Sequence, residues 1–276
     1  MYLYKERTAL ITGASTGIGA AFAHALATKG MNLILVARSQ EKLSHLAEAL
    51  MQQHAVHIDV VVADLSQEAA AQTVYDTVQW QQRRVDLLIN NAGVTTYGRF
   101  DQQSLRGQQD EIQLNVNTVV NLTHLFLPAM IQNGHGAIIN VASTGGFLSL
   151  PYQAVYSGTK AFIIAWSEAL WAETQQHGIS VITLCPGPTD TNIYKAMEPD
   201  FMGIGKRVPP ENVVRTGLQA LEKGKMTVID GRNNYWFSQL YRVLPRRVLV
   251  NLSEQQLRPK SAVPLKKERN IPKINS

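Results

Sequence analysis

A tyrosine and a lysine stand four residues apart in the stretch Tyr156-Ser-Gly-Thr-Lys160. The run that follows, Ala161 to Glu173, is rich in Ala, Leu, Trp and Glu and predicts a helix. Residues four apart on a helix lie on one face, so the phenol and the ammonium would share one space. The ammonium would favour the phenolate and lower the tyrosine pKa from its ordinary value of about 10. A phenol tuned in this way can serve as a general acid or base.

Such a pair is common on helices, so it indicates catalysis only where a cofactor site and a second polar group accompany it. The start of the chain offers the cofactor site. The apolar run Thr8-Ala-Leu-Ile-Thr12 leads into Gly13-Ala-Ser-Thr-Gly17-Ile-Gly19, and a helix pattern follows over Ala20 to Lys29. Glycines there would let the backbone approach a pyrophosphate at the positive end of that helix. The spacing is GxxxGxG rather than GxGxxG.

The elements that must position these groups alternate regularly. Strand and helix patterns alternate from residue 8 to residue 90, with the second strand expected over Asn32 to Ala37 and the third helix over Ser66 to Val78. This alternation predicts parallel strands with crossover helices. Further strands are expected over 137–141, 179–184 and 226–230. We therefore predict an α/β fold, a Rossmann-type doubly wound parallel sheet of about seven strands, forming a single domain with a C-terminal helical extension.

Polar residues in the middle of the chain are candidates for the second group. Ser143 follows the expected strand Ala137 to Val141, at the sheet edge where open α/β sheets bind ligands. It precedes Tyr156 by 156 − 143 = 13 residues, enough for a loop to return to the helix. The long helix pattern from Ser104 to Met130 contains Asn115 and Asn117. An Asn in mid-helix can hold a water or kink the helix, but two exposed polar residues would give the same pattern.

The end of the second strand bears on the choice of cofactor. NAD-binding versions of this fold place an acidic residue there for the ribose hydroxyls. Here Ala37 and Arg38 occupy that place, and a guanidinium suits a 2′-phosphate. This favours NADP, the alternative being a solvated surface arginine. Asp64, after the third strand, would either cap the next helix or face the adenine end of the cofactor.

Taken together, these motifs resemble those of the short-chain dehydrogenase/reductase family, in its compact single-domain branch. The resemblance covers about residues 8–231 and keeps the family's order and spacing. Its pieces are Thr12-Gly-Ala-Ser-Thr-Gly-Ile-Gly19, Asp64-Leu65, Asn90-Asn-Ala-Gly93, Asn115, Ser143, Tyr156 with Lys160, and Pro186-Gly187. It implies an NADP(H)-dependent oxidoreductase that interconverts a carbonyl and a secondary alcohol. Met and Phe residues in the segment 192–210 would suit an apolar ketone or aldehyde as the substrate. The alternatives are an NAD-dependent alcohol dehydrogenase and a catalytically inactive binding protein on the same scaffold.

The resemblance also implies roles for individual residues. Tyr156 would exchange the substrate proton, and Lys160 would bind the nicotinamide ribose and lower the tyrosine pKa. Ser143 would orient the carbonyl, and Asn115, which matches the family's Asn-Val pair, would hold a water in a proton relay. Thr118 stands where the family carries a glycine, and Thr16 where many NADP-dependent members carry a basic residue. The cofactor-binding residues would be Gly13, Ser15, Thr16, Gly17, Ile18, Gly19, Arg38, Asp64, Leu65, Asn91, Ala92, Gly93, Tyr156, Lys160, Pro186, Gly187, Thr189 and Thr191.

Composition limits the other classes of function. The net charge is +5, but residues 232–276 hold ten Lys or Arg and two Glu, a balance of +8, which leaves 5 − 8 = −3 for residues 1–231. Because the basic charge is confined to the tail, nucleic-acid binding is not expected. The scattered histidines and single cysteine, Cys185, predict no metal and no internal disulfide, which suits the reducing cytoplasm. The start of the chain does not resemble a secretory signal. The sequence contains no run of 18 or more apolar residues, so a membrane-spanning helix is not expected.

Two segments are expected at the C-terminal side. Residues 1–231 would form the catalytic domain, with a substrate lid over 192–210, and residues 232–276 a basic, aromatic-rich extension. We expect the stretch Tyr235 to Leu252 to pack on the protein, with contact to an anionic membrane or a partner subunit as alternatives. The polar segment Lys260 to Ser276 is expected to be mobile. The resemblance further implies a homodimer or homotetramer.

Overall fold

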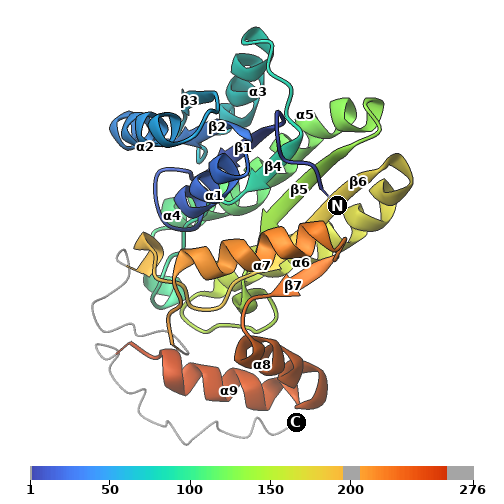
Figure 1. The fold of residues 1–276 in the computed structure, drawn as a ribbon. Coiled ribbons are helices and arrows are strands. Elements are labelled where there is room, and N and C mark those ends of the chain that lie inside the picture. Colours follow the sequence, from blue (N-terminus) through green and yellow to red (C-terminus); the bar gives the residue numbers. More distant parts are fainter. Residues whose placement is uncertain (1, 195–205, 260–276) are drawn as a thin grey trace, which may run out of the picture.

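A parallel sheet organises the chain in the computed structural model, which describes residues 2–194 and 206–259 (Figure 1). Within these residues the sheet has seven strands in the order β3-β2-β1-β4-β5-β6-β7, and every neighbouring pair is parallel. The predicted doubly wound sheet is therefore confirmed. The strands are β1 Thr8–Thr12, β2 Asn32–Ala37, β3 Ile58–Val62, β4 Leu87–Asn90, β5 Gly136–Val141, β6 Ile179–Cys185 and β7 Thr227–Ile229.

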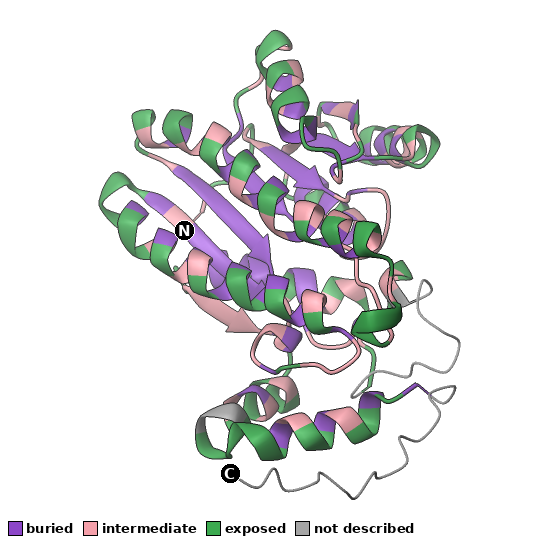
Figure 2. Cartoon of the chain, turned by 180° about the vertical axis from the view of Figure 1, so that it is seen from behind, coloured by how far each residue is buried: buried purple, intermediate pink, exposed green. Residues whose placement is uncertain are grey.

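Helices cover both faces of the sheet, as the crossover connections require. One face carries α1 Gly17–Thr28, α2 Gln40–Gln53 and α7 Pro210–Glu222. The other carries α3 Ala70–Trp80, α5 Thr118–Gln132 and α6 Ala154–Thr174, and α4 Leu105–Ile112 packs on α6. The central strands are consequently buried on both sides (Figure 2), which explains why they read as continuous apolar runs rather than alternating ones.

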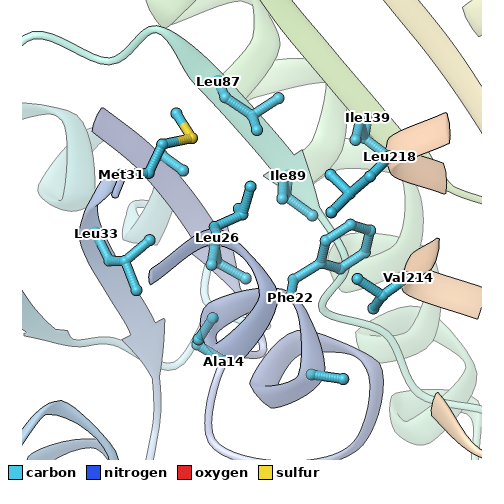
Figure 3. Close-up of a cluster of buried hydrophobic side chains, with 14 of the residues drawn as sticks. Ala14, Phe22, Leu26, Met31, Leu33, Leu87, Ile89, Ile139, Val214 and Leu218 are labelled. Carbon is cyan, nitrogen blue, oxygen red and sulfur yellow. The ribbon is translucent and has the colours of Figure 1, made fainter. Parts of the chain in front are cut away.

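The core on the α1 face fixes the helix that follows the glycine loop. Phe22 and Leu26 of α1 are fully buried against Ile89 of β4 and Leu218 of α7 (Figure 3). Removing a buried aromatic ring such as Phe22 would cost about 3 to 5 kcal/mol, so this packing holds the start of α1 firmly against the sheet edge.

Two helix predictions need correction. The third helix was expected from Ser66 but begins at Ala70, because the Asp64 carboxylate accepts the N–H and O–H of Ser66 and closes a turn there. The long helix expected over 104–130 is interrupted by a π turn, η2, over Gln113–Asn117. The whole run Leu105–Gln132 is long and apolar enough to cross a membrane by length and composition. Several of its apolar side chains, among them Leu122, Phe126 and Met130, pack in the core, so we interpret it as a core element.

The C-terminal extension forms two further helices, α8 Arg232–Val243 and α9 Arg246–Leu257. They lie beyond the end of β7, at the edge where the strands terminate (Figure 1). The domain boundary predicted at residue 231 falls between β7 and α8. Residues 195–205 of the expected lid, and the segment 260–276 expected to be mobile, lie outside the described residues.

Candidate active site

The point where the strand order reverses lies between β1 and β4, and hydrogen bonds fix the loops on both sides of it. The Thr12 hydroxyl accepts the N–H groups of Asn91 at 2.9 Å and Ala92 at 3.0 Å. The Asn91 side-chain amide donates to the Thr12 carbonyl at 2.8 Å. Ligands of doubly wound sheets bind in the crevice at such a reversal.

The glycine loop after β1 has the backbone shape that a pyrophosphate requires. Gly13 has a φ of +66°, and a Cβ there would lie 2.9 Å from the Asn91 side chain. A Cβ on Gly19 would clash with the carbonyl oxygen of Gly13. Helix α1 begins with Thr16 as its N-cap, whose side chain makes no capping hydrogen bond, so the first N–H groups can serve an anion instead. The loop therefore fits a dinucleotide.

The other predicted cofactor residues of the N-terminal half lie around this loop. Ser15, Thr16, Gly17 and Ile18 are partly buried where the loop enters α1. Exposed Arg38 follows β2 at the same sheet edge. Partial burial of Asp64 opposes its ionisation, but the Ser66 hydrogen bonds and the charge of Arg38 together hold its pKa below the usual range. Leu65 is buried, and its carbonyl accepts the Thr118 hydroxyl at 2.7 Å, so the threonine that departs from the family glycine ties α5 to this loop.

Tyr156 and Lys160 both lie on α6, one turn apart, as the sequence predicts. The Lys160 ammonium lies 5.9 Å from the centroid of the Tyr156 ring and donates to the Val141 carbonyl at 2.9 Å. Only 5% of Lys160 is exposed. Burial lowers the Lys160 pKa from 10.5 to about 8, and the nearby Glu111 carboxyl group offsets part of this shift.

Two glycines show that the four predicted catalytic residues converge. A Cβ on Gly145 would lie 3.4 Å from the Ser143 hydroxyl oxygen and 3.5 Å from the Tyr156 ring. A Cβ on Gly93 would lie 3.2 Å from the Asn115 side-chain oxygen and 3.6 Å from the Lys160 nitrogen. Since Tyr156 and Lys160 belong to one helix face, the residues form one cluster at the carboxyl edge of β4 and β5.

The π turn separates the two candidate asparagines. Asn115 is buried, and its side chain donates to the Val94 carbonyl at 2.9 Å and accepts the Val94 N–H at 3.0 Å. It also donates to the Thr159 hydroxyl at 3.2 Å, next to Lys160. Asn117 is exposed and bonds only locally, to Gln113. The wider turn presents Asn115 to the site, and π turns often occur at functional positions.

The loop after β6 lies between the catalytic cluster and the glycine loop. The Pro186 carbonyl accepts the Thr144 N–H at 2.8 Å, which joins this loop to the one that carries Ser143. Thr189 is buried, and a Cβ on Gly17 would lie 3.0 Å from the Thr191 methyl group, so this loop meets the glycine loop. A Cβ on Gly187 would clash with the side-chain amide of Asn234 on α8.

A buried carboxyl group near the cluster was missed by sequence reasoning. Glu111 is fully buried, and one of its oxygens accepts the N–H and O–H of Thr96 at 3.0 and 2.6 Å. Its other oxygen has no hydrogen-bond partner among the described residues. Burial raises the Glu111 pKa, against the hydrogen bonds from Thr96 and the charge of Lys160. The available signal was spacing, because Glu111 lies one helical turn before Asn115.

Comparison with known proteins identifies the family. A family model described as short chain dehydrogenase matches residues 7–201. The chain belongs to this short-chain dehydrogenase family. The sequence is 31% identical, over 88% of this chain and 78% of the relative, to a very-long-chain 3-oxoacyl-CoA reductase from Anas platyrhynchos.

Solved structures of the same family are equally similar. A short-chain dehydrogenase from Sphingobium yanoikuyae in complex with NADPH is 31% identical, with a TM-score of 0.78, and the match covers 87% of this chain and 97% of that one. A bulky-bulky ketone specific alcohol dehydrogenase from Comamonas testosteroni is 30% identical, with a TM-score of 0.74 over 86% and 92% of the two chains. This short-chain dehydrogenase is therefore an oxidoreductase that interconverts carbonyls and alcohols.

Other reactive groups are few in this short-chain dehydrogenase. Cys185, at the end of β6, is fully buried, and burial raises its thiol pKa, so it has the character of a small apolar core residue. Across residues 2–194 and 206–259, no group of three or more His, Cys, Asp and Glu side chains is placed to hold a metal ion.

The C-terminal helix α9 is fastened to two loops beside the catalytic cluster. The Tyr97 hydroxyl donates to the Leu257 carbonyl at 2.6 Å, and the Tyr152 hydroxyl donates to the Glu254 carboxylate at 2.6 Å. Hydrogen bonds from Arg258 and Tyr152 lower the Glu254 pKa. Leu257 is buried among Tyr97, Tyr152 and Leu150. The extension of this dehydrogenase thus packs on the loops that carry Tyr97 and Tyr152.

Replacing both tyrosines with phenylalanine should loosen α9 without unfolding the sheet. The two lost hydrogen bonds together contribute about 2 to 4 kcal/mol, so backbone amides of residues 254–257 should exchange hydrogen about 30-fold to 1,000-fold faster. Mass-spectrometric hydrogen exchange measures this directly. Tyr2→Phe is the matched control, since it removes a phenol bond to the Asp86 carbonyl at the other end of the sheet. Unchanged exchange in the double variant would show that the two bonds do not hold α9.

Proposed function

We propose that this chain is an NADP(H)-dependent reductase of ketones or aldehydes carried on apolar molecules. The observation that carries the proposal is the convergence of Ser143, Tyr156, Lys160 and Asn115 around Gly145 and Gly93. An amine, a phenol, a hydroxyl and an amide at one sheet edge, beside a loop suited to a dinucleotide, are the groups that carbonyl reduction requires.

Each side chain has a distinct part in the proposed reaction. Bound NADPH supplies the hydride that reaches the carbonyl carbon. Tyr156 protonates the carbonyl oxygen as it gains negative charge, and the buried Lys160 ammonium stabilises the phenolate that remains. The Ser143 oxygen accepts the Gly145 N–H at 3.0 Å, so its hydrogen is directed away from that bond, and we assign it to the substrate oxygen.

Proton supply to Tyr156 would run through Lys160 and a water held near Asn115. Both side chains flank Gly93, and both are at least 90% buried, which shields the path from bulk solvent. The two bonds between Asn115 and Val94 fix the amide in place. A rigid amide can orient a water molecule at little entropic cost.

An apolar substrate is supported by the side chains beyond Tyr156. Tyr97, Leu150 and Tyr152 gather there around the buried Leu257, and because they are only partly buried they offer apolar surface next to the cluster. Apolar lining with a few polar groups is typical of small-molecule sites. The names of two similar proteins, for a very-long-chain oxoacyl-CoA and for bulky ketones, point in the same direction. NADPH consumption should therefore be measured with ketones of increasing alkyl length, and kcat/KM should rise along the series.

The preference for NADP is assigned to Arg38. Its exposed guanidinium lies at the end of β2, and its charge acts on Asp64 in the neighbouring loop after β3. Charge-assisted hydrogen bonds to a 2′-phosphate are the strong class of such bonds. Arg38→Asp should therefore raise the KM for NADPH about 100-fold and reverse the preference towards NADH.

Steady-state kinetics with both cofactors tests this assignment. Lys42→Asp makes the same change of charge at an exposed position of α2 nearby and should leave the preference as it is. An Arg38→Asp enzyme that still prefers NADPH would remove the basis for the NADP assignment, and a wild-type preference for NADH would favour the NAD-dependent alcohol dehydrogenase.

We further propose that the enzyme is a homo-oligomer in the cytoplasm. Leu105 and Ile112 of α4 and Phe162 of α6 are exposed large apolar side chains on neighbouring helices. We assign this surface to a contact with a second copy of the chain, giving a homodimer or homotetramer. A cytoplasmic location is supported by the free thiol of Cys185.

A further inference from the structure

The two C-terminal helices carry an apolar surface that is exposed among the described residues, 2–194 and 206–259. We call it the α8–α9 surface, and define it by the exposed large side chains Tyr235, Trp236, Leu240, Val243, Leu244, Val248 and Leu252. Trp236 is 66% exposed and Val243 is 79% exposed. Single exposed apolar residues are ordinary, but a series along two consecutive helices indicates a partner.

The same helices already have a buried face, so their exposure is not a sign of loose attachment. Ser238 of α8 and Leu249, Ser253 and Leu257 of α9 are buried. The expectation that the stretch 235–252 packs on the protein is therefore met only by part of it. Val248 and Leu252 lie one turn apart on α9, next to the exposed Arg247. Each helix consequently has one face that packs on the described part of the chain and another, apolar face that is exposed.

The charge around this surface is strongly positive. Residues 232–259 contain five arginines and one glutamate, a balance of 5 − 1 = +4, whereas residues 1–231 carry −3. Arg232, Arg246 and Arg247 are exposed, while the carboxylate of Glu254 is engaged by Arg258 and Tyr152. Residues 260–276 add five Lys or Arg and one Glu to the same end of the sequence. Apolar side chains bordered by arginine match the surface of an anionic bilayer.

The position of the surface relates it to the active-site end of the enzyme. Helix α9 is bonded to Tyr97 and Tyr152, and α8 packs on Gly187, so both helices lie at the carboxyl edge of the sheet. We propose that the α8–α9 surface docks the enzyme on membranes that contain anionic phospholipids. Docking there places the substrate side of the enzyme next to the bilayer, where apolar carbonyl compounds accumulate.

Vesicle co-sedimentation of the full-length protein tests the proposal. Vesicles of phosphatidylcholine alone should bind little protein, and an equimolar mixture with phosphatidylglycerol should bind most of it, with release by salt. The double variant Trp236→Gln/Val243→Gln removes apolar contact, and Arg246→Gln/Arg247→Gln removes charge. Each should reduce partition into anionic vesicles about 10-fold to 30-fold.

Matched controls lie at distant sites. Trp80→Gln changes a tryptophan of α3 that is 86% exposed, and Lys223→Gln/Lys225→Gln changes two exposed cations after α7. Both should bind vesicles like the wild type. NADPH oxidation and a thermal unfolding curve for each variant confirm that the fold is retained. Membrane docking would be refuted if the wild-type protein did not co-sediment with anionic vesicles, or if the surface variants bound these vesicles as well as the control variants do.

If a second copy of the chain or another part of the same chain covered the α8–α9 surface instead of a membrane, other measurements would show it. A second copy of the chain would appear in light scattering as an oligomer that Trp236→Gln/Val243→Gln dissociates. Coverage by another part of the chain would protect Trp236 from acrylamide quenching when no vesicles are present. Either outcome overturns the proposal, whereas a readily quenched Trp236 that becomes protected and blue-shifted on anionic vesicles supports it.

Discussion

A Tyr156→Phe enzyme should bind NADPH normally and turn over about 100 to 10,000 times more slowly than the wild type. The expected loss is that of a general acid, because phenylalanine keeps the ring and removes only the proton that the proposed reaction transfers. The Tyr156 ring lies next to Gly145, and phenylalanine keeps that ring, so the packing should be retained. Single-turnover reduction of a ketone measures the chemical step, and fluorescence titration measures NADPH affinity.

The matched control is Tyr75→Phe, which removes a hydroxyl from a partly buried tyrosine that packs on Phe126 of α5. It should leave kcat unchanged. Turnover by Tyr156→Phe at the wild-type rate would show that another group supplies the proton, and the proposed mechanism would fail while the fold and family would stand.

Lys160→Met should abolish most activity and at the same time stabilise the folded protein at neutral pH. Without the ammonium, the phenolate of Tyr156 loses its stabilising charge, so kcat should fall about 100-fold or more. The free energy of unfolding should rise, because burial of the Lys160 charge destabilises the folded state and methionine removes that charge. The difference between 10.5 and about 8 corresponds to about 3 kcal/mol. Loss of the Lys160 hydrogen bond to Val141 would cancel about 1 to 3 kcal/mol of that gain.

The pH dependence of unfolding separates the two contributions. A lysine whose pKa is lowered in the folded state binds its proton more weakly there than in the unfolded chain. The full penalty is therefore present below pH about 8, is relieved as the pH rises towards 10.5, and is absent above that. The advantage of Lys160→Met in urea unfolding should shrink by about 3 kcal/mol between about pH 7 and pH 10.5. Lys223→Met, at an exposed position, should show no such trend; a constant difference for Lys160→Met would contradict the assigned cause.

The elements that could be predicted from the sequence are those whose hydrophobic pattern and flanking turn residues indicate the same secondary structure. The buried parallel strands read as apolar runs with turn residues at their ends, and β1 and β2 were predicted to the residue. The spacing of Tyr156 and Lys160 needed only helical geometry. Asn115 and Asn117 could not be distinguished by periodicity, because the π turn between α4 and α5 changes the helix repeat at that point.

What could not be predicted depends on contacts between distant parts of the chain. The bond from Tyr97 to the Leu257 carbonyl spans 160 residues, and no local signal marks either partner. Glu111 looks like a surface residue of an amphipathic helix until Thr96 is placed beside it. Asp64 was assigned either to a helix cap or to the adenine, and its bonds to Ser66 show a turn instead. Whether it also meets the cofactor stays a prediction.

The close approach of Asn234 to Gly187 makes the loop after β6 dependent on helix α8. A glycine is required at 187 because the first turn of α8 occupies the space that any larger side chain would take. The loop expected beside the nicotinamide is thus shaped partly by a helix that begins after the catalytic sheet has ended. A protein truncated after residue 231, or a chimera joined there, should lose order in that loop, whereas a junction after residue 259 should preserve it.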